Sequence, residues 1–259
     1  MKKFITLSIV LFSICLLWAK PPKKDKYLLP KSWVKIPAGK VLIENKEQNL
    51  SEFYILETEI SNLHYLEFLS DFQKSHSKED YQKVLPDTTK WTTEIGMAKE
   101  FTNQYLRYLG FRNFPTVGVS YHGAELYCDW IEKKLNEKFG TNKIEVRLPT
   151  EAEWMRAARG ESNAEFAINT KNKKAGMNYR KDDSAKKSNL ITMDIFSFPP
   201  NNFGLYNMSG NVAEMVAEEG KTKGGSWNST ENLVKIDTSE KYTEPSVFVG
   251  FRPVLVIKE

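Results

Sequence analysis

Cysteine and histidine are scarce in this chain. Its 259 residues include two cysteines, Cys15 and Cys128, and three histidines, His64, His76 and His122. Cys15 lies in an N-terminal apolar run that we expect to be removed, which leaves one thiol and no internal disulfide. The histidines show no metal-ligand spacing to one another, so no local metal motif is indicated. A site made of two histidines and one carboxylate from distant positions stays open.

The chain also lacks an apolar run long enough to span a membrane. The uncharged apolar run near the N-terminus covers residues 4–18, whereas a transmembrane helix needs about 20 residues. Two lysines precede this run, and Ala19 ends it at an acceptable cleavage site. Residues 1–19 therefore have the pattern of a secretory signal, and we expect an exported protein of the periplasm or cell envelope.

Two further features of the N-terminal region bear on localisation. In an alternative interpretation Cys15 becomes a lipid-modified N-terminus, and the membrane is then reached only through that anchor. Residues 20–32 begin with KPPKKD and are predicted to form a basic, proline-containing spacer before the folded domain.

Excess charge of one sign is absent. Lysine and arginine number 37 against 33 acidic residues, a net charge of +4 that falls to +2 when Lys2 and Lys3 leave with the signal. A balance this close to neutral gives no electrostatic reason to expect nucleic-acid binding.

Polar donors and glycines gather in residues 203–227. Asn207, Asn211 and Glu214 supply side-chain oxygens, while Gly204 and Gly210 permit the positive φ angles of tight turns. Such an oxygen-only set suits a hard cation such as calcium. The alternative is an Asx-turn followed by a strand, because asparagine and glycine mark turns more often than metal sites.

Helix signals are strong at two places. Ser120 is a candidate N-cap of a helix that should end before Gly140 and bury Cys128. Thr150 and Glu153 have the spacing of a capping box, which fixes where the next helix begins.

Other elements are predicted from periodicity. Short strands are expected within residues 33–43 and 53–56, followed by a helix capped by Ser61. The leucines and phenylalanine at positions 63, 66, 69 and 72 are expected to share its buried face. Residues 74–113 show little periodicity and are predicted to form a large insertion or an irregular layer rather than a separate domain. Residues 115–119 are predicted to form a buried strand.

Five blocks of sequence, taken together, resemble one known family. They are Pro115–Trp130, Arg147–Gly160, Phe203–Glu214, Gly224–Trp227 and Gly250–Arg252. Their order and spacing are similar to those of the sulfatase-modifying factor family, which includes the formylglycine-generating enzymes. The resemblance covers residues 33–257 and implies an α+β, C-type-lectin-like domain with much irregular structure.

The resemblance also assigns roles to particular positions. It implies a structural calcium ion held by Asn207, Gly210, Val212 and Glu214. The two cysteines that bind copper in the family's oxidases are matched here by residues 229 and 234, a serine and a valine. Neither can act as a thiolate ligand, so no copper site is expected.

The combined expectation is an exported, non-catalytic domain that serves as a calcium-stabilised binding or scaffold module of the cell envelope, with an envelope protein as partner. Leu85–Trp91 looks like an insertion of the family's gliding-motility and type IX secretion lipoproteins. The alternative is that this stretch is simply a turn with a buried tryptophan. The alternative function is an oxidoreductase with altered metal chemistry that uses Ser229, Arg252 or a histidine-bound metal.

Overall fold

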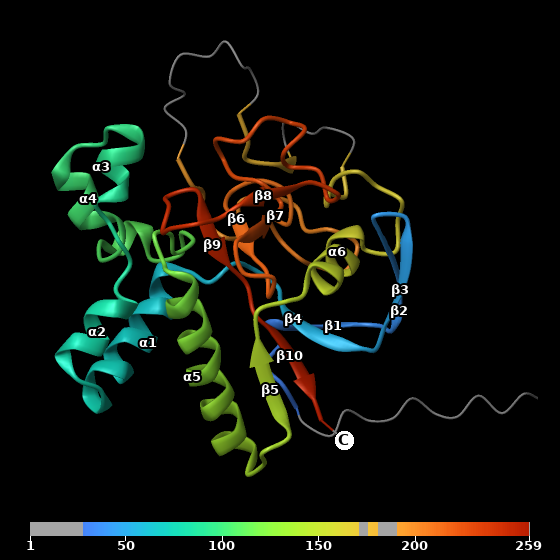
Figure 1. Ribbon diagram of the computed structural model, residues 1–259, viewed down its shortest axis with the longest axis horizontal. Coiled ribbons are helices and arrows are strands. Elements are labelled where there is room, and N and C mark those ends of the chain that lie inside the picture. The colour runs from blue at the N-terminus through green and yellow to red at the C-terminus, as the bar shows by residue number, and fades with distance from the viewer. Residues whose placement is uncertain (1–27, 171–175, 181–190, 259) are drawn as a thin grey trace, which may run out of the picture.

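The computed structural model describes residues 28–170, 176–180 and 191–258 (Figure 1). The predicted signal, Cys15 and residues 20–27 of the spacer lie outside these ranges. None of the helices within them has the length and apolar character that crossing a membrane requires.

The described chain contains both helices and strands, in an order that mixes the two. The helices are α1 (Asn62–Ser75), α2 (Lys78–Val84), α3 (Lys90–Ile95), α4 (Lys99–Tyr105), the 3₁₀ turn η1 (Leu109–Phe111), α5 (Tyr121–Phe139) and α6 (Glu151–Arg159). The strands are β1 (Trp33–Ile36), β2 (Gly39–Ile43), β3 (Lys46–Leu50), β4 (Phe53–Leu56), β5 (Ile144–Arg147), β6 (Ala213–Met215), β7 (Lys221–Lys223), β8 (Ser239–Lys241), β9 (Val249–Phe251) and β10 (Val254–Ile257).

Two four-stranded sheets meet where the chain passes from β9 to β10. One sheet has the order β1-β4-β10-β5 and is antiparallel throughout. The other has the order β8-β7-β6-β9, in which β6 and β9 are parallel and pair Glu214 with Gly250. Arg252 and Pro253 are the two residues between β9 and β10, so Arg252 lies at the junction of the sheets.

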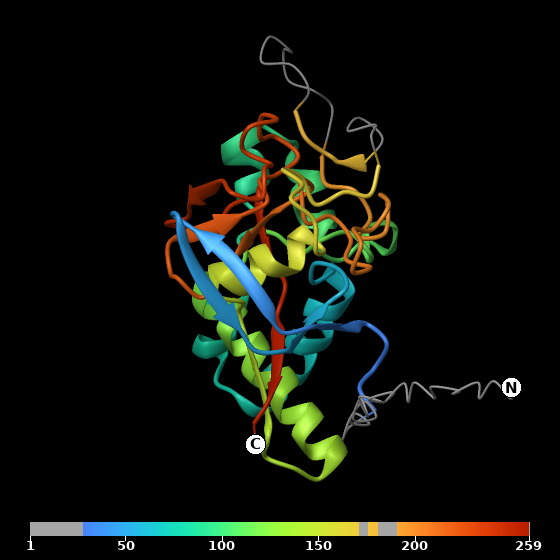
Figure 2. The same ribbon diagram turned by 90° about the vertical axis from the view of Figure 1, so that its right-hand side faces the viewer.

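Helices cover the sheets on different sides. α1, α2 and α5 stand together on one side in Figure 1, whereas α6 and the β2–β3 hairpin lie on the other. The turned view places the hairpin across α6 (Figure 2). The largest apolar cluster joins α1 and α5 to β5, β9 and β10, and includes Cys128. A second cluster packs α6, with Trp154 at its centre, against β1, β2 and β4.

The predicted helix signals are confirmed. Ser120 accepts a hydrogen bond from the Gly123 amide at the start of α5, and Gly140 ends this helix in the left-handed conformation. Thr150 and Glu153 form the reciprocal capping box of α6. Each cap satisfies amides that the first turn of a helix leaves without a partner.

The predicted buried face of α1 is partly wrong. Leu63 is 40% exposed and Leu66 is half-buried, while the aromatic residues Tyr65 and Phe68 are buried with Leu69 and Phe72. A step of three residues is shorter than the 3.6-residue turn of an α-helix. Four positions spaced by three therefore drift around the helix, and they cannot all face the core.

Two further predictions are corrected. Residues 74–113 are not an irregular layer, since α2, α3, α4 and η1 lie there. Residues 115–119 are all buried, as predicted, but do not form a strand: only Pro115 makes a bridge, with Ser61. Gly118 has a φ of 73°, which takes the backbone out of the extended conformation.

Candidate functional site

The polar loop before β6 turns through residues with positive φ, as its composition predicts. Asn207 and Asn211 have φ of 56° and 66°, in the left-handed region that asparagine tolerates better than most residues. Gly210 has a φ of 84°, and a Cβ at this position would lie 2.4 Å from the carbonyl oxygen of Asn178. Only glycine therefore allows the close approach of these two segments.

Glu59 lies at the centre of the hydrogen-bond network that holds this loop. It is fully buried between β4 and α1, and its two carboxylate oxygens accept from Asn207 Nδ2 at 3.0 Å and from Asn211 Nδ2 at 2.8 Å. The same amide groups also donate to the backbone carbonyls of Ile195 and Met193. One carboxylate thus ties together three segments that are distant in the sequence.

Burial raises the pKa of Glu59 to about 7, with a contribution in the same direction from Glu214 and an opposing one from Arg252. The neutral form of Glu59 is therefore accessible near physiological pH.

Glu214 forms a buried ion pair with Arg252. Both side chains are at most 1% exposed, and Arg252 Nη2 lies 2.7 Å from Glu214 Oε1. Arg252 Nε donates to both carboxylate oxygens, and Trp154 Nε1 donates to Oε2 at 2.7 Å. Arg252 Nη1 donates to the carbonyl of Leu56 and Nη2 to that of Tyr206, so all three guanidinium nitrogens donate hydrogen bonds.

The residues expected to bind calcium fit such an ion in part. Asn207 Oδ1 is buried without a hydrogen-bond partner in the described chain, as expected of an oxygen that coordinates a cation. Gly210 and Val212 follow it in the same loop. Glu214, in contrast, already accepts from Arg252 and Trp154, so calcium would have to share this carboxylate with a guanidinium group.

The three histidines are not brought together with acids into a metal cluster. Among residues 28–170, 176–180 and 191–258 there is no group of three or more histidine, cysteine, aspartate or glutamate side chains able to hold a metal ion. His64 contacts Ser61, His76 stacks on Phe72, and His122 is exposed.

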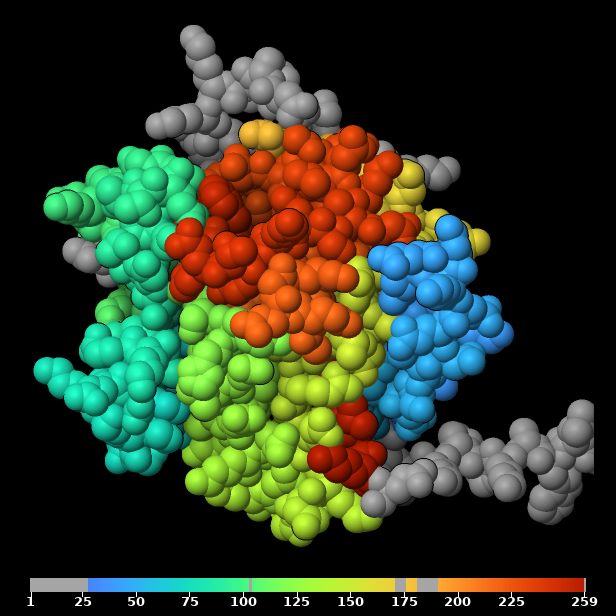
Figure 3. All heavy atoms as spheres, in the orientation of Figure 1, coloured from blue at the N-terminus to red at the C-terminus, as the bar shows by residue number. Residues whose placement is uncertain are grey.

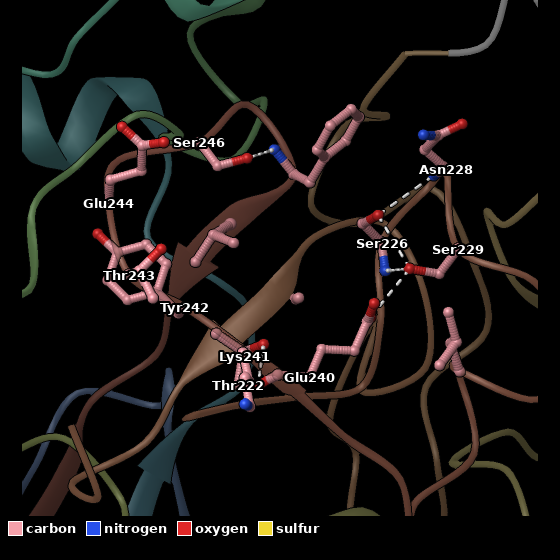
Figure 4. Close-up of a pocket in the computed structure, with 14 residues that line it drawn as sticks. Thr222, Ser226, Asn228, Ser229, Glu240, Lys241, Tyr242, Thr243, Glu244 and Ser246 are labelled. Atoms are coloured by element: carbon pink, nitrogen blue, oxygen red, sulfur yellow. Dashed lines mark hydrogen bonds between the residues drawn. The ribbon is translucent and has the colours of Figure 1, made fainter. Parts of the chain in front are cut away.

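A groove opens beside β7 and β8, and its lining includes Ser229, one of the two positions matched to the copper-binding cysteines (Figure 4). Its volume is about 270 Å³. Hydroxyl groups and one half-buried carboxylate, that of Glu240, supply its polar wall, and Leu233, Phe248 and Val249 supply an apolar one. In Figure 3 the orange-to-red segment that contains most of these residues forms the upper central part of the visible face.

Ser229 lies in this groove but its hydroxyl is fully engaged. It accepts from the Ser226 amide at 2.9 Å, lies 3.2 Å from Ser226 Oγ and donates to Glu240 Oε2 at 3.1 Å (Figure 4). Burial raises the pKa of Glu240, and the hydrogen bond from Ser229 opposes this shift. The arrangement holds Ser229 in place as a hydrogen-bonding group rather than exposing it as a nucleophile.

Val234 and Arg252 lie outside the lining of this groove. Val234 is fully buried and packs with Phe166, Met177 and Tyr179 in a separate apolar cluster. Arg252 belongs to the ion pair described above. Of the residues considered for altered chemistry, the structure thus brings only Ser229 to the groove.

Trp91 of the Leu85–Trp91 segment lies near the groove. It is buried in α3, and its ring lies parallel to that of Trp227 with 6.5 Å between centroids. Phe248, which lines the groove, packs against Trp227 in turn. The tryptophan of this segment is therefore buried, and an ion pair between Lys90 and Glu244 fastens α3 to the groove rim.

Sequence reasoning missed two carboxylates of these sites, Glu59 and Glu240. Each lies in a run of mixed polar residues without a motif, ETEISN and TSEKY. Their partners are 148 and 11 positions away, so only the tertiary structure shows the pairing.

We predict that Glu59 makes folding pH-dependent. Its pKa is raised from 4.5 to about 7 in the folded protein, so its contribution to the free energy of unfolding is full below about pH 4.5 and is lost as the pH rises through 7. The free energy of unfolding is measured by denaturation in chelator. Across this pH range, the value for wild type should fall by about 3 kcal/mol relative to that of Glu59→Gln. The same change at the exposed Glu52 should leave the pH profile of wild type intact; parallel profiles for wild type and Glu59→Gln would contradict the prediction.

Comparison with known proteins gives a consistent picture. The profile of the Sulfatase-modifying factor enzyme 1-like domain matches residues 19–257. The formylglycine-generating enzyme of Mycobacterium tuberculosis is 35% identical over 115 residues, 40% of this chain and 33% of that protein. The inactive C-alpha-formylglycine-generating enzyme 2 of Bos taurus is 33% identical over 133 residues, 45% and 40% of the two chains.

The serine/threonine-protein kinase pkn1 of Chlamydia pneumoniae is 37% identical over 110 residues, 40% of this chain but 14% of the kinase. The chain thus matches less than half the length of each of these relatives.

Solved structures share the fold across nearly the whole domain. PvdO from Pseudomonas aeruginosa superimposes with a TM-score of 0.62 at 20% identity, covering 87% of this chain and 94% of PvdO. CarF gives a TM-score of 0.61 at 18% identity, with 89% and 100% covered. Because the family profile spans almost the entire chain and its blocks occur in register on this α+β fold, the protein belongs to the sulfatase-modifying factor family.

Proposed function

We propose that this protein is an exported, non-catalytic formylglycine-generating-enzyme-like domain that serves as a calcium-stabilised binding or scaffold module of the cell envelope. The observation that carries the proposal is the state of the two positions matched to the copper-binding cysteines. Ser229 is locked between Ser226 and Glu240, and Val234 is buried in an apolar cluster. Neither position offers the soft sulfur ligand that copper(I) requires.

The groove retains the properties of a binding surface. Its hydroxyls and the Glu240 carboxylate offer hydrogen-bond donors and acceptors, and the side chains of Leu233 and Phe248 offer apolar contact. This mixture suits an extended segment of a protein partner, which presents both backbone amides and side chains. Two relatives from Bos taurus and Mus musculus whose names describe them as inactive support a retained fold without the oxidase reaction.

Calcium is assigned to the loop of Asn207, Gly210, Val212 and Glu214. The unpartnered Asn207 Oδ1 supports this assignment, since a buried carbonyl oxygen without a donor is rare in proteins. A divalent cation here would also offset the charge of Glu59, which lies within hydrogen-bond distance of the same asparagine. The ion would then stiffen a loop that has few backbone ladder bonds of its own.

We predict that the purified protein binds no stoichiometric copper(I) and consumes no oxygen with a Cys-x-Pro-x-Arg peptide, because it lacks the thiolate pair. Copper titration and an oxygen electrode measure the two quantities. A Ser229→Cys, Val234→Cys double variant, in which cysteines replace the residues at the two matched positions, is the positive control for copper binding. Turnover by wild type above the background without enzyme would contradict the proposal.

We predict that calcium raises the melting temperature of wild type and that Asn207→Ala abolishes this shift, since a ligand that binds only the native state stabilises it by mass action. Asn211→Ala is the matched control: it loses a similar bond to Glu59, but its Oδ1 already accepts from Met193 N and Asn178 Nδ2. In chelator, both variants should have a lower melting temperature than wild type. Added calcium should raise the melting temperature of Asn211→Ala but not that of Asn207→Ala. Equal calcium responses in the two variants would remove the assignment.

We predict that a photo-crosslinking amino acid at position 228 captures an envelope protein in the cells that produce this chain. Asn228 is half-buried in the groove wall, and its only hydrogen bond among the described residues comes from its backbone amide, so the substitution preserves the groove. The same amino acid at the exposed Leu42, on the β2–β3 hairpin, is the control. Identical products at both positions, or none at 228, would argue against the groove as a binding surface.

A further inference from the structure

The exposed apolar side chains of this protein are not scattered evenly. Seven large hydrophobic residues of the described chain are exposed: Leu28, Leu42, Leu63, Tyr108, Leu109, Met193 and Phe196. The last five come from three segments: Leu63 lies at the start of α1, Tyr108 and Leu109 lie at η1, and Met193 and Phe196 lie in the segment 193–196. Single exposed hydrophobic residues are ordinary, whereas a gathering of them marks an interaction surface.

Backbone hydrogen bonds join these three segments. The Leu63 amide donates to the carbonyl of Arg112 at 2.9 Å, and the Ile195 amide donates to the carbonyl of Asn113 at 2.9 Å. The segment 107–112, RYLGFR, therefore lies between the other two. We call it the arginine-flanked tip.

The tip is held rigidly. Asn62 Nδ2 donates to the carbonyls of Tyr105 and Phe111, each at 3.0 Å, and so fixes both ends of the turn that contains η1. The ring of Phe111 packs against Phe101 and Tyr105 beneath it. Leu109 nevertheless remains 78% exposed and Tyr108 59% exposed, so these side chains are presented to solvent by an ordered backbone.

The charge of the tip has one sign. Arg107 and Arg112 flank the apolar residues and are exposed, and no carboxylate of the described chain forms an ion pair with either. Residues 107–114 contain no aspartate or glutamate. Asp194, in the adjoining segment, uses its carboxylate to accept from the Phe196 amide. Two arginines without ion-pair partners among the described residues leave the tip itself complementary to an anionic surface.

We propose that the arginine-flanked tip docks on an anionic membrane surface, with Leu109 and Tyr108 entering the headgroup boundary and Arg107 and Arg112 contacting lipid phosphates. Tyrosine is favoured at this boundary because one end of its ring is apolar and the other is polar. Arginine can keep its charge in the headgroup layer while its stem lies along apolar surface. A membrane is favoured over a protein partner because the tip exposes single side chains rather than a groove, and lipid needs no matching shape.

The test labels the tip itself, so that the N-terminal segment of the full chain does not confuse the result. In a Cys15→Ser background, an environment-sensitive fluorophore is attached at Leu109→Cys; Cys128 is buried and remains unlabelled. Leu42→Cys is the matched control, since Leu42 is also exposed but lies on the β2–β3 hairpin, across the molecule from α3 and α4 (Figure 1).

Vesicles containing one-third phosphatidylglycerol should raise and blue-shift the emission at position 109 but not at 42, and neutral phosphatidylcholine vesicles should have little effect. Arg107→Gln with Arg112→Gln should lower the affinity for anionic vesicles about 30-fold. The proposal is overturned if positions 42 and 109 respond alike, if the double variant binds as wild type does, or if only an acidic polypeptide, without lipid, changes the emission at 109.

Discussion

The buried ion pair between Glu214 and Arg252 is the interaction on which the rest of this fold depends. Arg252 lies between β9 and β10, where the chain leaves one sheet and enters the other, and Glu214 lies in β6 beside it. The guanidinium group also binds the carbonyls at the end of β4 and in the polar loop. Removing either partner would leave an uncompensated buried charge, at a cost of about 3–5 kcal/mol.

Around this pair, polar side chains replace regular secondary structure. The loop before β6 has few ladder bonds, yet Glu59, Asn207 and Asn211 fasten it to the segment that precedes α1 and to residues 193–195. Networks of this kind are rigid when every member has a partner, and costly when one does not. Asn207 Oδ1 is buried without a partner among the described residues, and the proposed cation would complete the network at this oxygen.

The proposed function separates the architecture of the family from the chemistry of its oxidases. The fold contains a groove, and the hydroxyl of Ser229 lies in its wall. The second matched position, Val234, lies in an apolar cluster, where its side chain contributes to packing. A fold can keep its stability while its function changes, and the ion pair of Glu214 and Arg252, which joins the two sheets, is not part of the groove lining.

Sequence by itself determined the local features and the family. The N-cap at Ser120, the capping box of Thr150 and Glu153, and the burial of Cys128 follow from signals that lie within a few residues of one another. The absence of a cysteine pair at positions 229 and 234 is likewise a property of the sequence alone. The loop of Asn207 and Gly210 was recognised as a tight polar turn for the same reason, since left-handed conformations have a local signature.

Only the tertiary structure decided which partners the buried charges have. Glu214 was expected to face a cation, and its carboxylate is held by Arg252, 38 residues away, and by Trp154, 60 residues away. Glu59 carries no motif and becomes central only because folding brings two asparagines to it. The aromatic face of α1 and the exposure of Leu109 were decided in the same way. Hydrogen bonds and packing act over a few ångströms in space, whatever the separation along the chain, so pairings of this kind leave no periodic trace in one sequence.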